Sequence, residues 1–522
     1  MKNGGNIRLP LFFRRFPNPL EEVRTLTIDN HAFDVLATVD LGSNSFRLQI
    51  SRLVEDQLYT LDSLKETVRL GAGLGVDKVL DEDTQERALA CLARFGERLR
   101  GFAPTQVRVV GTNTLRVAKN APEFISRAES LLGFPIEIIA GREEARLIYL
   151  GAAHTLPATR ERRMVVDIGG GSTEFIIGSQ YRALATESLP LGCVSYSLRY
   201  FPDGKLGKNQ FREATLAARN EIQRIRQTFR PEEWQLAVGT SGTARSLRDI
   251  LELNDYSSAD ITLEGMELLR QELIRRGQIK NVNLNGLKSD RAPVLPGGLA
   301  IMIGVFEELG VNKMTVAEGA LRDGVLYDLL GRHREHDMRE TTVMQFCRRY
   351  HVDGEQMRRV MQLAESLFRK VSGDDLDQDW LKLLLWSARL HEIGLSIAHT
   401  AYHKHSAYIL QNADMPGFSR REQTSLGQIV LCQRGDMGKL LPYVNDRMLW
   451  VAIVCLRMAV LFFRSRHDAQ LPPALDLKPG ARGFVLTLDR SWVADNPLTA
   501  NALRQEIGQW KNIGYVLDLH LV

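Results

Sequence analysis

Cysteine is scarce in this chain, and its few positions are scattered. Five cysteines occur among 522 residues, and none of their spacings matches a metal-binding or paired arrangement. Because disulfide frameworks belong mainly to secreted domains, this pattern favours a reducing compartment such as the cytoplasm. The five are Cys91, Cys193, Cys347, Cys432 and Cys455.

The chain also lacks a strong excess of either charge. Its 67 Lys and Arg residues nearly balance 63 Asp and Glu residues, which leaves a formal net charge of +4. Proteins that bind nucleic acid through its phosphates usually carry a larger basic excess, so we expect no nucleic-acid partner. A local group of basic side chains could still receive another polyanion.

Long hydrophobic runs are missing as well. The longest apolar stretch lies at 448–463 and is interrupted by Arg457, which makes it shorter than the roughly 20 residues that span a bilayer. Near the N-terminus the only apolar run is LPLFF, too short for the core of a signal peptide. We therefore expect a cytoplasmic protein and leave peripheral contact with the inner membrane open.

Among the motifs that are present, a glycine-rich hairpin at 165–177 is the most informative. One apolar run ends at Asp167, the turn is Gly169-Gly170-Gly171-Ser172, and a second apolar run follows Glu174. Bare glycine backbone lets consecutive N–H groups point at one anion, and the serine adds a hydroxyl donor. The two carboxylates are ligands of the kind that Mg²⁺ prefers. An ordinary glycine hairpin without a ligand is the alternative at this point.

The same element occurs earlier in the chain, at 39–48. Asp40 in this segment precedes Asp167 by 167 − 40 = 127 residues. The Val-Gly-Thr sequences around Gly111 and Gly239 repeat at nearly the same spacing, 239 − 111 = 128 residues. The repetition indicates that one α/β unit occurs twice.

A third pair repeats with a longer spacing. Ala140 and Ala317 are 317 − 140 = 177 residues apart, so the second unit carries an insertion of about fifty residues. Three ordered matches predict two α/β halves that face each other across a cleft, each contributing one glycine hairpin. In the first half we expect strands at 35–41, 46–53, 106–111 and 135–140, and helices at 82–100 and from 141 onward.

The remaining sequence is helical for most of its length. Apolar residues follow a helical period at 357–371, and a helix expected at 380–395 carries His391-Glu392. Lys478-Pro479-Gly480 is interpreted as a linker into a short β-α-β tail. The predicted organisation is an N-terminal extension at 1–32, α/β halves at 33–155 and 156–330, a helical domain at 335–468 and a small α/β domain at 469–522.

Several motifs, taken in order, resemble one known family. They are VDLGSNSF, GREEARLIY, VVDIGGGSTE, LGC, GTSGT and EGALRDGVLY, followed in the helical part by HEIG and HKHSAYILQNADMPGF. Together they resemble the exopolyphosphatase/guanosine pentaphosphate phosphohydrolase family, a branch of the actin-like ATPase superfamily. The layout is most similar to that of the long bacterial exopolyphosphatases.

The resemblance implies both a fold and an activity. The fold class is α/β, with duplicated actin-like (ribonuclease H-like) domains around a cleft, then an all-α HD-like domain and a small α/β C-terminal domain. The activity is processive hydrolysis of the terminal phosphoanhydride of inorganic polyphosphate, which releases orthophosphate. The alternative is removal of the 5′-terminal phosphate of guanosine pentaphosphate by the same site. Family members require Mg²⁺, are often stimulated by K⁺, and commonly form homodimers.

The resemblance also assigns roles to particular residues. Glu144 falls on the catalytic glutamate that activates water. The expected metal ligands are Asp40, Asp167 and Glu174. The expected substrate-binding residues are Asn44, Ser45, Arg116, Gly169, Gly170, Gly171, Ser172, Cys193 and Arg291.

Each of these roles has a structural alternative. Glu144 and Glu143 open a helix, where the helix dipole stabilises any carboxylate. Asp40 could cap its own turn. The two arginines could be solvated surface residues, as most arginines are, and Cys193 is more often a small core residue than a reactive thiol.

Three rival functions accompany the main interpretation. His391-Glu392 stands where HD-type metal phosphohydrolases carry His-Asp, but glutamate is one methylene longer, so we favour a structural role. An actin-like ATP-dependent kinase or chaperone would need an adenosine pocket, and the chain has Glu318-Gly319-Ala320-Leu321 where the usual Gly-Gly turn belongs. A module that only senses polyphosphate would not need Glu144.

Overall fold

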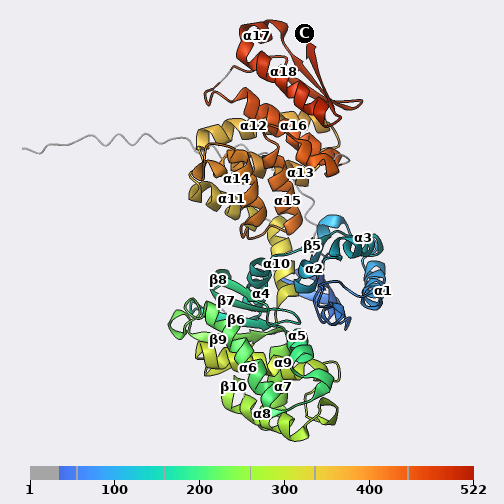
Figure 1. The fold of residues 1–522 in the computed structure, drawn as a ribbon, viewed down its shortest axis with the longest axis vertical. Coiled ribbons are helices and arrows are strands. Elements are labelled where there is room, and N and C mark those ends of the chain that lie inside the picture. The colour runs from blue at the N-terminus through green and yellow to red at the C-terminus, as the bar shows by residue number, and fades with distance from the viewer. Residues whose placement is uncertain are drawn as a thin grey trace, which may run out of the picture.

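The computed structural model describes residues 35–54, 57–157, 159–258, 260–333, 337–443, 446–468 and 470–522. The extension predicted at 1–32 lies outside them. Figure 1 shows two α/β lobes at one end of an elongated molecule, the helical region beyond them, and the C-terminal sheet at the far end.

The first lobe is built on a five-stranded sheet in the order β3-β2-β1-β4-β5. Strands β1, β2 and β3 form an antiparallel meander, whereas β4 and β5 run parallel to β1. The apolar residues of β1 and β4 are buried between layers, as parallel central strands require. The elements are β1 (Val35–Leu41), β2 (Phe46–Val54), β3 (Gln57–Glu66), α1 (Glu82–Arg98), β4 (Val107–Gly111), α2 (Asn113–Val117), α3 (Ala121–Leu132) and β5 (Ile136–Ile138).

The second lobe repeats this topology with an additional edge strand. Its sheet has the order β10-β11-β9-β6-β7-β8, with β6, β7 and β8 antiparallel and β9 and β11 parallel to β6. The shared order 3-2-1-4-5 makes both lobes actin-like domains of the ribonuclease H-like type. The elements are β6 (Arg163–Ile168), β7 (Thr173–Ser179), β8 (Arg182–Leu189), α5 (Cys193–Tyr200), α6 (Lys208–Ile222), β9 (Leu236–Thr240), α7 (Ser241–Leu253), β10 (Ile261–Thr262), α8 (Leu263–Arg276), α9 (Leu295–Leu309) and β11 (Lys313–Val316).

The insertion inferred from the repeat spacing lies between β9 and β11. It contains β10, α8 and the loop that leads into α9. Helix α9 is apolar on every side and is buried against α5 and α6, as a core helix should be. The segment Ala292–Leu309 is long and apolar enough to cross a membrane by composition, but most of it is buried inside the second lobe.

Two helices cross between the lobes. Helix α4 (Gly141–Thr155) follows β5 but packs on β7 and β8, and α10 (Leu321–His333) follows β11 but packs on β1 and on α4. The two helices touch through glycine, because a Cβ at Gly324 would lie 1.8 Å from the carbonyl oxygen of Leu147. Because each helix packs on the lobe opposite to the strand that it follows, α4 and α10 hold the strand ends of both sheets around one cleft.

The helical region and the C-terminal sheet share a hydrophobic core. Trp450 of the helical region and Trp510 of the small domain have ring centroids 5.8 Å apart, within one continuous cluster of buried side chains. The helices are α11 (Met338–Arg349), α12 (Gly354–Ser372), α13 (Gln378–Leu390), α14 (Tyr402–Asn412), α15 (Arg420–Leu431) and α16 (Arg447–Phe462). The small domain contains β12 (Asp476–Gly480), β13 (Gly483–Leu488), α17 (Arg490–Asp495), α18 (Pro497–Asn512) and β14 (Val516–Leu521).

Two local expectations are corrected by the structure. The helix expected at 380–395 ends at Leu390, because the backbone at Gly394 lies against α14, where a Cβ would be 2.3 Å from the carbonyl oxygen of Tyr402. Lys478-Pro479-Gly480 is the end of strand β12 and not a linker. Proline is tolerated there because β12 is an edge strand of its sheet.

Candidate active site

The tips of the two glycine hairpins meet in the cleft. A Cβ at Gly170 would lie 2.9 Å from Cβ of Ser43 and 3.2 Å from the backbone nitrogen of Asn44. A Cβ at Gly171 would lie 3.3 Å from the Ser43 hydroxyl. Only glycine permits so close an approach, so the backbone of each lobe forms part of one shared site.

Helix α5 holds the second hairpin from behind. The N–H of Cys193 donates to the carbonyl of Gly169 at 2.9 Å, and the N–H of Val194 donates to the carbonyl of Gly170 at 3.0 Å. Among the described residues no protein acceptor takes the N–H groups of Gly170 and Gly171. The turn therefore keeps backbone donors for an anion.

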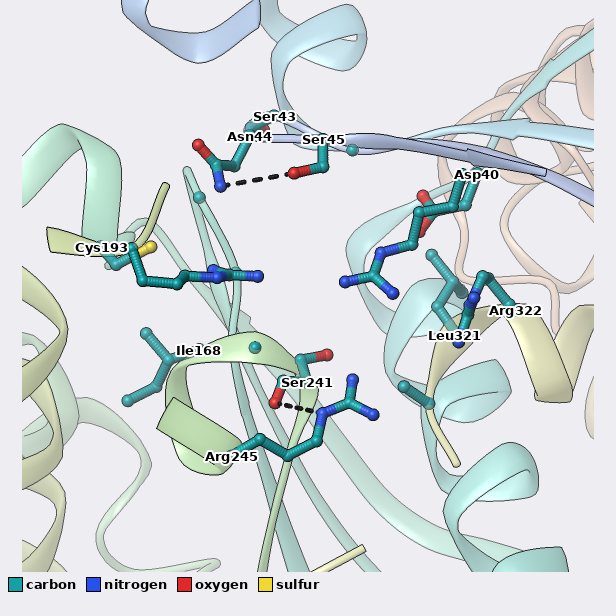
Figure 2. A pocket seen from close by; sticks show the side chains of 17 residues that line it. Asp40, Ser43, Asn44, Ser45, Ile168, Cys193, Ser241, Arg245, Leu321 and Arg322 are labelled. Atoms are coloured by element: carbon teal, nitrogen blue, oxygen red, sulfur yellow. Dashed lines mark hydrogen bonds between the residues drawn. The ribbon is translucent and has the colours of Figure 1, made fainter. Parts of the chain in front are cut away.

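One side of the cleft is a basic compartment. Its cavity of about 110 Å³ is lined by four arginines and by both hairpins. In Figure 2, Asn44 and Ser45 lie along one side of this cavity, Asp40 and Arg322 along another, and Ser241 and Arg245 opposite the first hairpin. The four arginines are Arg47, Arg245, Arg291 and Arg322.

Few of the arginines in this compartment form close ion pairs, although Asp40 lies near Arg47 and Arg322. Arg245 is 3.4 Å from the exposed carboxylate of Glu318, whereas the other three arginines form no ion pair with a described residue. Burial, together with the nearby Arg322, lowers the pKa of the Arg47 guanidinium to about 10. Such a pocket is prepared for a ligand with several negative charges.

The other side of the cleft is an acidic compartment. A neighbouring cavity of about 90 Å³ is lined by four carboxylates and by the same two hairpins. Asp40, Gly170 and Ser241 line both cavities, so the two compartments are directly adjacent. The carboxylates are Asp40, Glu144, Asp167 and Glu174.

Burial raises the pKa of every carboxylate in the acidic compartment. It raises the pKa of Asp40 to about 6 and that of Glu144 to about 7. The pKa of Asp167 is also raised by burial, and that of Glu174 is raised well above its usual range by burial and by the charge of Glu144. Oδ1 of Asp40 is buried without a hydrogen-bond partner among the described residues.

Hydrogen bonds orient three of these carboxylates. Nη1 of Arg116 donates to Oε2 of Glu144 at 3.1 Å. The Ser241 hydroxyl donates to Oδ2 of Asp167 at 2.5 Å, and the hydroxyl of Ser188 donates to Oε1 of Glu174 at 2.8 Å. Ser241 has a φ of 66°, a left-handed conformation that is unfavourable for serine and typical of functional sites.

The repeated hairpins explain why one compartment is basic and the other acidic. In the first hairpin Asp40 is directly opposite Arg47, and in the second Asp167 is directly opposite Glu174. The same position of the duplicated unit thus carries a cation in one lobe and an anion in the other. The charge separation across the cleft follows from this one divergence and from the residues around it.

Most of the residues singled out in the sequence lie in this cleft. Glu144 and the three expected metal ligands meet in the acidic compartment, together with Gly171 and Ser172. Arg116 lines neither cavity and instead pairs with Glu144. The basic compartment is lined by Asn44, Ser45, Gly169, Gly170, Cys193 and Arg291.

The sequence did not point to Arg47, Ser241, Arg245 or Arg322, which line the basic compartment. Arg47, Ser241 and Arg322 belong to, or directly follow, a quoted motif, and Arg245 lies two residues beyond one. The ends of neighbouring parallel strands meet at one edge of a sheet. A polar residue in or near such a motif could therefore have been predicted to lie in the site.

The His391-Glu392 pair in the helical region is largely bonded to protein groups, although Nε2 of His391 is buried without a hydrogen-bond partner among the described residues. His391 is buried and its Nδ1 is 2.7 Å from the carbonyl oxygen of Ala388. Both carboxylate oxygens of Glu392 accept from Arg466, at 2.7 and 2.9 Å. In the part of the chain that the structure describes, no group of three or more His, Cys, Asp or Glu side chains is placed to hold a metal ion. The HD-like character of this region stays a prediction.

Comparison with solved structures identifies related folds. A crystal structure of an exopolyphosphatase from Cytophaga hutchinsonii is 25% identical over 57% of this chain and 98% of its own, with a TM-score of 0.51. An exopolyphosphatase-like protein is 23% identical over 57% of this chain and 99% of its own, also with a TM-score of 0.51. A Ppx/GppA family member from Aquifex aeolicus is 25% identical, with a TM-score of 0.47.

Two family models match the sequence itself. Residues 49–333 match the model of the Ppx/GppA phosphatase family, and residues 338–507 match the model of Ppx/GppA phosphatase domain III. The first match includes both crossing helices and most of both lobes, and the second covers the helical region and much of the small domain. With its duplicated actin-like lobes and its cleft of arginines and carboxylates, the chain belongs to the Ppx/GppA phosphatase family.

Proposed function

We propose that this phosphatase is an exopolyphosphatase, which hydrolyses the terminal phosphoanhydride of inorganic polyphosphate and releases orthophosphate. The observation that carries the proposal is the direct contact between a compartment of four arginines and a compartment of four carboxylates. A phosphate polymer needs a cationic channel for its length and a separate place where its last phosphorus meets water. A monoester would leave most of the arginines without a partner.

The residues of the cleft have complementary roles in this reaction. The terminal phosphate accepts from the free N–H groups of Gly170 and Gly171 and from the hydroxyl of Ser172, while the next phosphates lie against Arg291 and Arg322. Glu144 takes a proton from the attacking water, and the oxygen between the last two phosphates leaves with the shortened chain. A pKa of about 7 suits a general base at neutral pH.

Arg116 and Cys193 act beside the reacting atoms. Arg116 pairs with Oε2 of Glu144 at 3.1 Å and fixes the carboxylate toward the cavity. Cys193 lies behind the phosphate turn, and burial raises the pKa of its thiol, so it is a wall of the site and not a nucleophile.

The acidic compartment suits a magnesium ion that takes most of its ligands from water and phosphate, since no three carboxylates of the described residues are grouped to hold a metal by themselves. Its donors are hard carboxylate oxygens, Oδ1 of Asp40 has no hydrogen-bond partner among the described residues, and burial together with the charge of Glu144 raises the pKa of Glu174. Asp40 and Asp167, with Glu174 beside them, would hold Mg²⁺ through few protein ligands, as this ion prefers. When bound, the ion supplies charge neutralisation at the phosphate oxygens.

A second substrate is favoured by one specific feature. An apolar pocket of about 250 Å³ begins at Asn44 and Arg69 and continues over Leu198, Phe201 and further apolar side chains. Phosphate polymers gain nothing from such a surface, whereas a nucleobase would. Guanosine pentaphosphate, the alternative in this family, could place its base there with its phosphates in the cleft.

Orthophosphate release from both substrates tests the proposal. The experiment compares long-chain polyphosphate with guanosine pentaphosphate, each with Mg²⁺ and with excess chelator. We expect higher kcat/KM on polyphosphate and loss of both activities with chelator. A preference of several orders of magnitude for the nucleotide would reverse the ranking, and Leu198→Asp should then lower nucleotide turnover alone. If neither substrate releases orthophosphate, the proposal that the protein is a phosphoanhydride hydrolase is wrong.

A further inference from the structure

Three consecutive residues at the start of α4 point to three different neighbours. Glu144 faces the acidic compartment. The side chains of Arg142 and Glu143 instead reach the loop between α14 and α15 in the helical region, where they contact Asp414 and Gly417. The helix turn that carries the candidate base is therefore also the turn on which the helical region docks.

Both carboxylate oxygens of Glu143 are occupied. Oε2 accepts the backbone N–H of Gly417 at 3.0 Å and Nε of Arg146 at 2.8 Å, and Oε1 accepts Nη2 of Arg146, also at 2.8 Å. The residue is only 4% exposed. Stabilisation by the helix dipole does not require a carboxylate to be buried or to accept several hydrogen bonds. Glu143 therefore has a structural role beyond that of a negative charge in the first helical turn.

The peptide of Gly417 is held from both sides. Its N–H goes to Glu143, and its carbonyl oxygen accepts Nη2 of Arg332 on α10 at 3.0 Å. The residue has a φ of 89°, and a Cβ there would lie 3.0 Å from the backbone nitrogen of Arg339. Because both the backbone conformation and the space require glycine, this contact point has little freedom to shift.

The same turn is tied into the first lobe by a buried ion network. Arg146 also binds the carboxylate of Asp328 on α10. Asp328 accepts Nη1 of Arg108 on β4 at 2.7 Å, and Arg108 donates to Glu137 on β5 at 3.1 Å. Strands of the first lobe, both crossing helices and the helical region thus meet at Glu143 and its partners.

We propose that Glu143 is a positioning residue, which uses the docked helical region to fix the first turn of α4 and thereby the place of Glu144 in the cleft. The inference rests on the proposed role of Glu144 as the base. Displacement of the loop at Gly417 moves the turn by way of Glu143, although none of the described residues of the helical region lines the acidic compartment. A misplacement of about 1 Å at a reacting group is enough to lower a rate by about a hundredfold.

The test combines two variants with a matched control. Glu143→Gln keeps an oxygen for the Gly417 N–H but loses the charge that Arg146 binds. Gly417→Ala acts from the helical side alone. Gly435→Ala is the control, because Gly435 also has a left-handed φ, 74°, but nothing lies within 4 Å of an added Cβ. The assays are orthophosphate release, resolved into kcat and KM, its pH dependence, thermal unfolding, and hydrogen exchange of the first turn of α4.

We expect Glu143→Gln and Gly417→Ala to lower kcat by about ten- to hundredfold, with KM changed less than about twofold. Both should shift the acid limb of the pH–rate profile and speed hydrogen exchange in α4. Gly435→Ala should lower the unfolding temperature without these effects. If neither variant folds, Asp414→Asn gives the same readouts in smaller measure, because Asp414 is half exposed and binds Arg142.

Two results would overturn the inference. One is a folded Glu143→Gln or Gly417→Ala enzyme with wild-type kcat and acid limb, and the other is a Gly435→Ala enzyme that loses activity in the same way. A parallel Glu144→Gln variant separates this failure from that of the proposed function. If that variant keeps its turnover, Glu144 is not the base, while hydrogen exchange of α4 still reports whether Glu143 orders the turn.

Discussion

At the scale of single residues, the site is a set of buried charges that the fold alone does not favour. Asp40, Glu144, Asp167 and Glu174 are all buried, and burial raises the pKa of each. A group whose pKa is raised in the folded state stabilises the protein at low pH and loses that contribution as the pH rises through the folded value. At neutral pH these side chains therefore reduce stability in return for function.

Asp40→Asn should make the metal-free protein more stable and less active. The pKa of Asp40 is raised from 3.8 to about 6, so removal of the charge should add up to about 3 kcal/mol to the free energy of unfolding at neutral pH. Denaturant unfolding in the presence of chelator measures this gain, and orthophosphate release should fall by at least tenfold. A lower free energy of unfolding in Asp40→Asn would show that burial does not disfavour the charged carboxylate of Asp40.

Arg322→Gln should weaken substrate binding at the basic compartment. A charge-assisted bond to phosphate contributes about 1.5–3 kcal/mol, so KM for polyphosphate should rise by roughly ten- to hundredfold. The matched control is Arg248→Gln, since Arg248 pairs with Asp249 and Glu318 and does not line the cavity. Equal KM values for both variants would mean that Arg322 does not contact the polymer.

At the scale of helices and strands, the crossing of α4 and α10 holds the site together. Gly324→Ala would place a Cβ 1.8 Å from the carbonyl oxygen of Leu147, so the helices must separate, at a cost of about 3 kcal/mol or more. Gly508→Ala in α18, where nothing lies within 4 Å, should instead stabilise by about 0.5–1 kcal/mol. Chemical denaturation measures the free energy of unfolding of both variants. Equal changes in that free energy would contradict this account.

The helical region should lose stability in acid. Burial and the charges of Arg434, Lys404, Lys439 and Arg457 lower the pKa of His403 from 6.5 to about 4. Since the folded state favours the neutral ring, its contribution is complete above pH 6.5 and declines as the pH falls toward 4. Thermal unfolding should therefore move to lower temperature between pH 7 and pH 5, less so in His403→Gln. An equal decline in both proteins would assign the effect to other groups.

The sequence predicted the hairpins and most strands, because their apolar runs and glycine turns are local signals. It did not predict that α4 would pack on the second lobe, since the choice of a sheet depends on contacts far apart in the chain. Arg47 lies within the strand expected at 46–53 and carries no local signal of a functional role, and only its pairing opposite Asp40 explains its place in the cleft. The end of α13 at Leu390 likewise depends on α14, which the local pattern does not contain.

At the scale of the whole molecule, two copies of one unit have diverged into complementary halves. The lobes share a strand order, and their hairpins meet tip to tip, yet one copy has Arg47 where the other has Glu174. The helical region adds a third body, which docks on the turn that carries Glu144. The near-neutral net charge of +4 conceals this internal separation of charge.

Glu144→Gln tests the central claim most directly, if binding and turnover are measured on the same sample. Loss of the base should reduce orthophosphate release from polyphosphate by at least a thousandfold, while polyphosphate binding to the arginines is retained and the unfolding temperature is not lowered, because a buried charge is removed. Turnover within tenfold of the wild-type value, in a folded protein that still binds the polymer, would contradict the account.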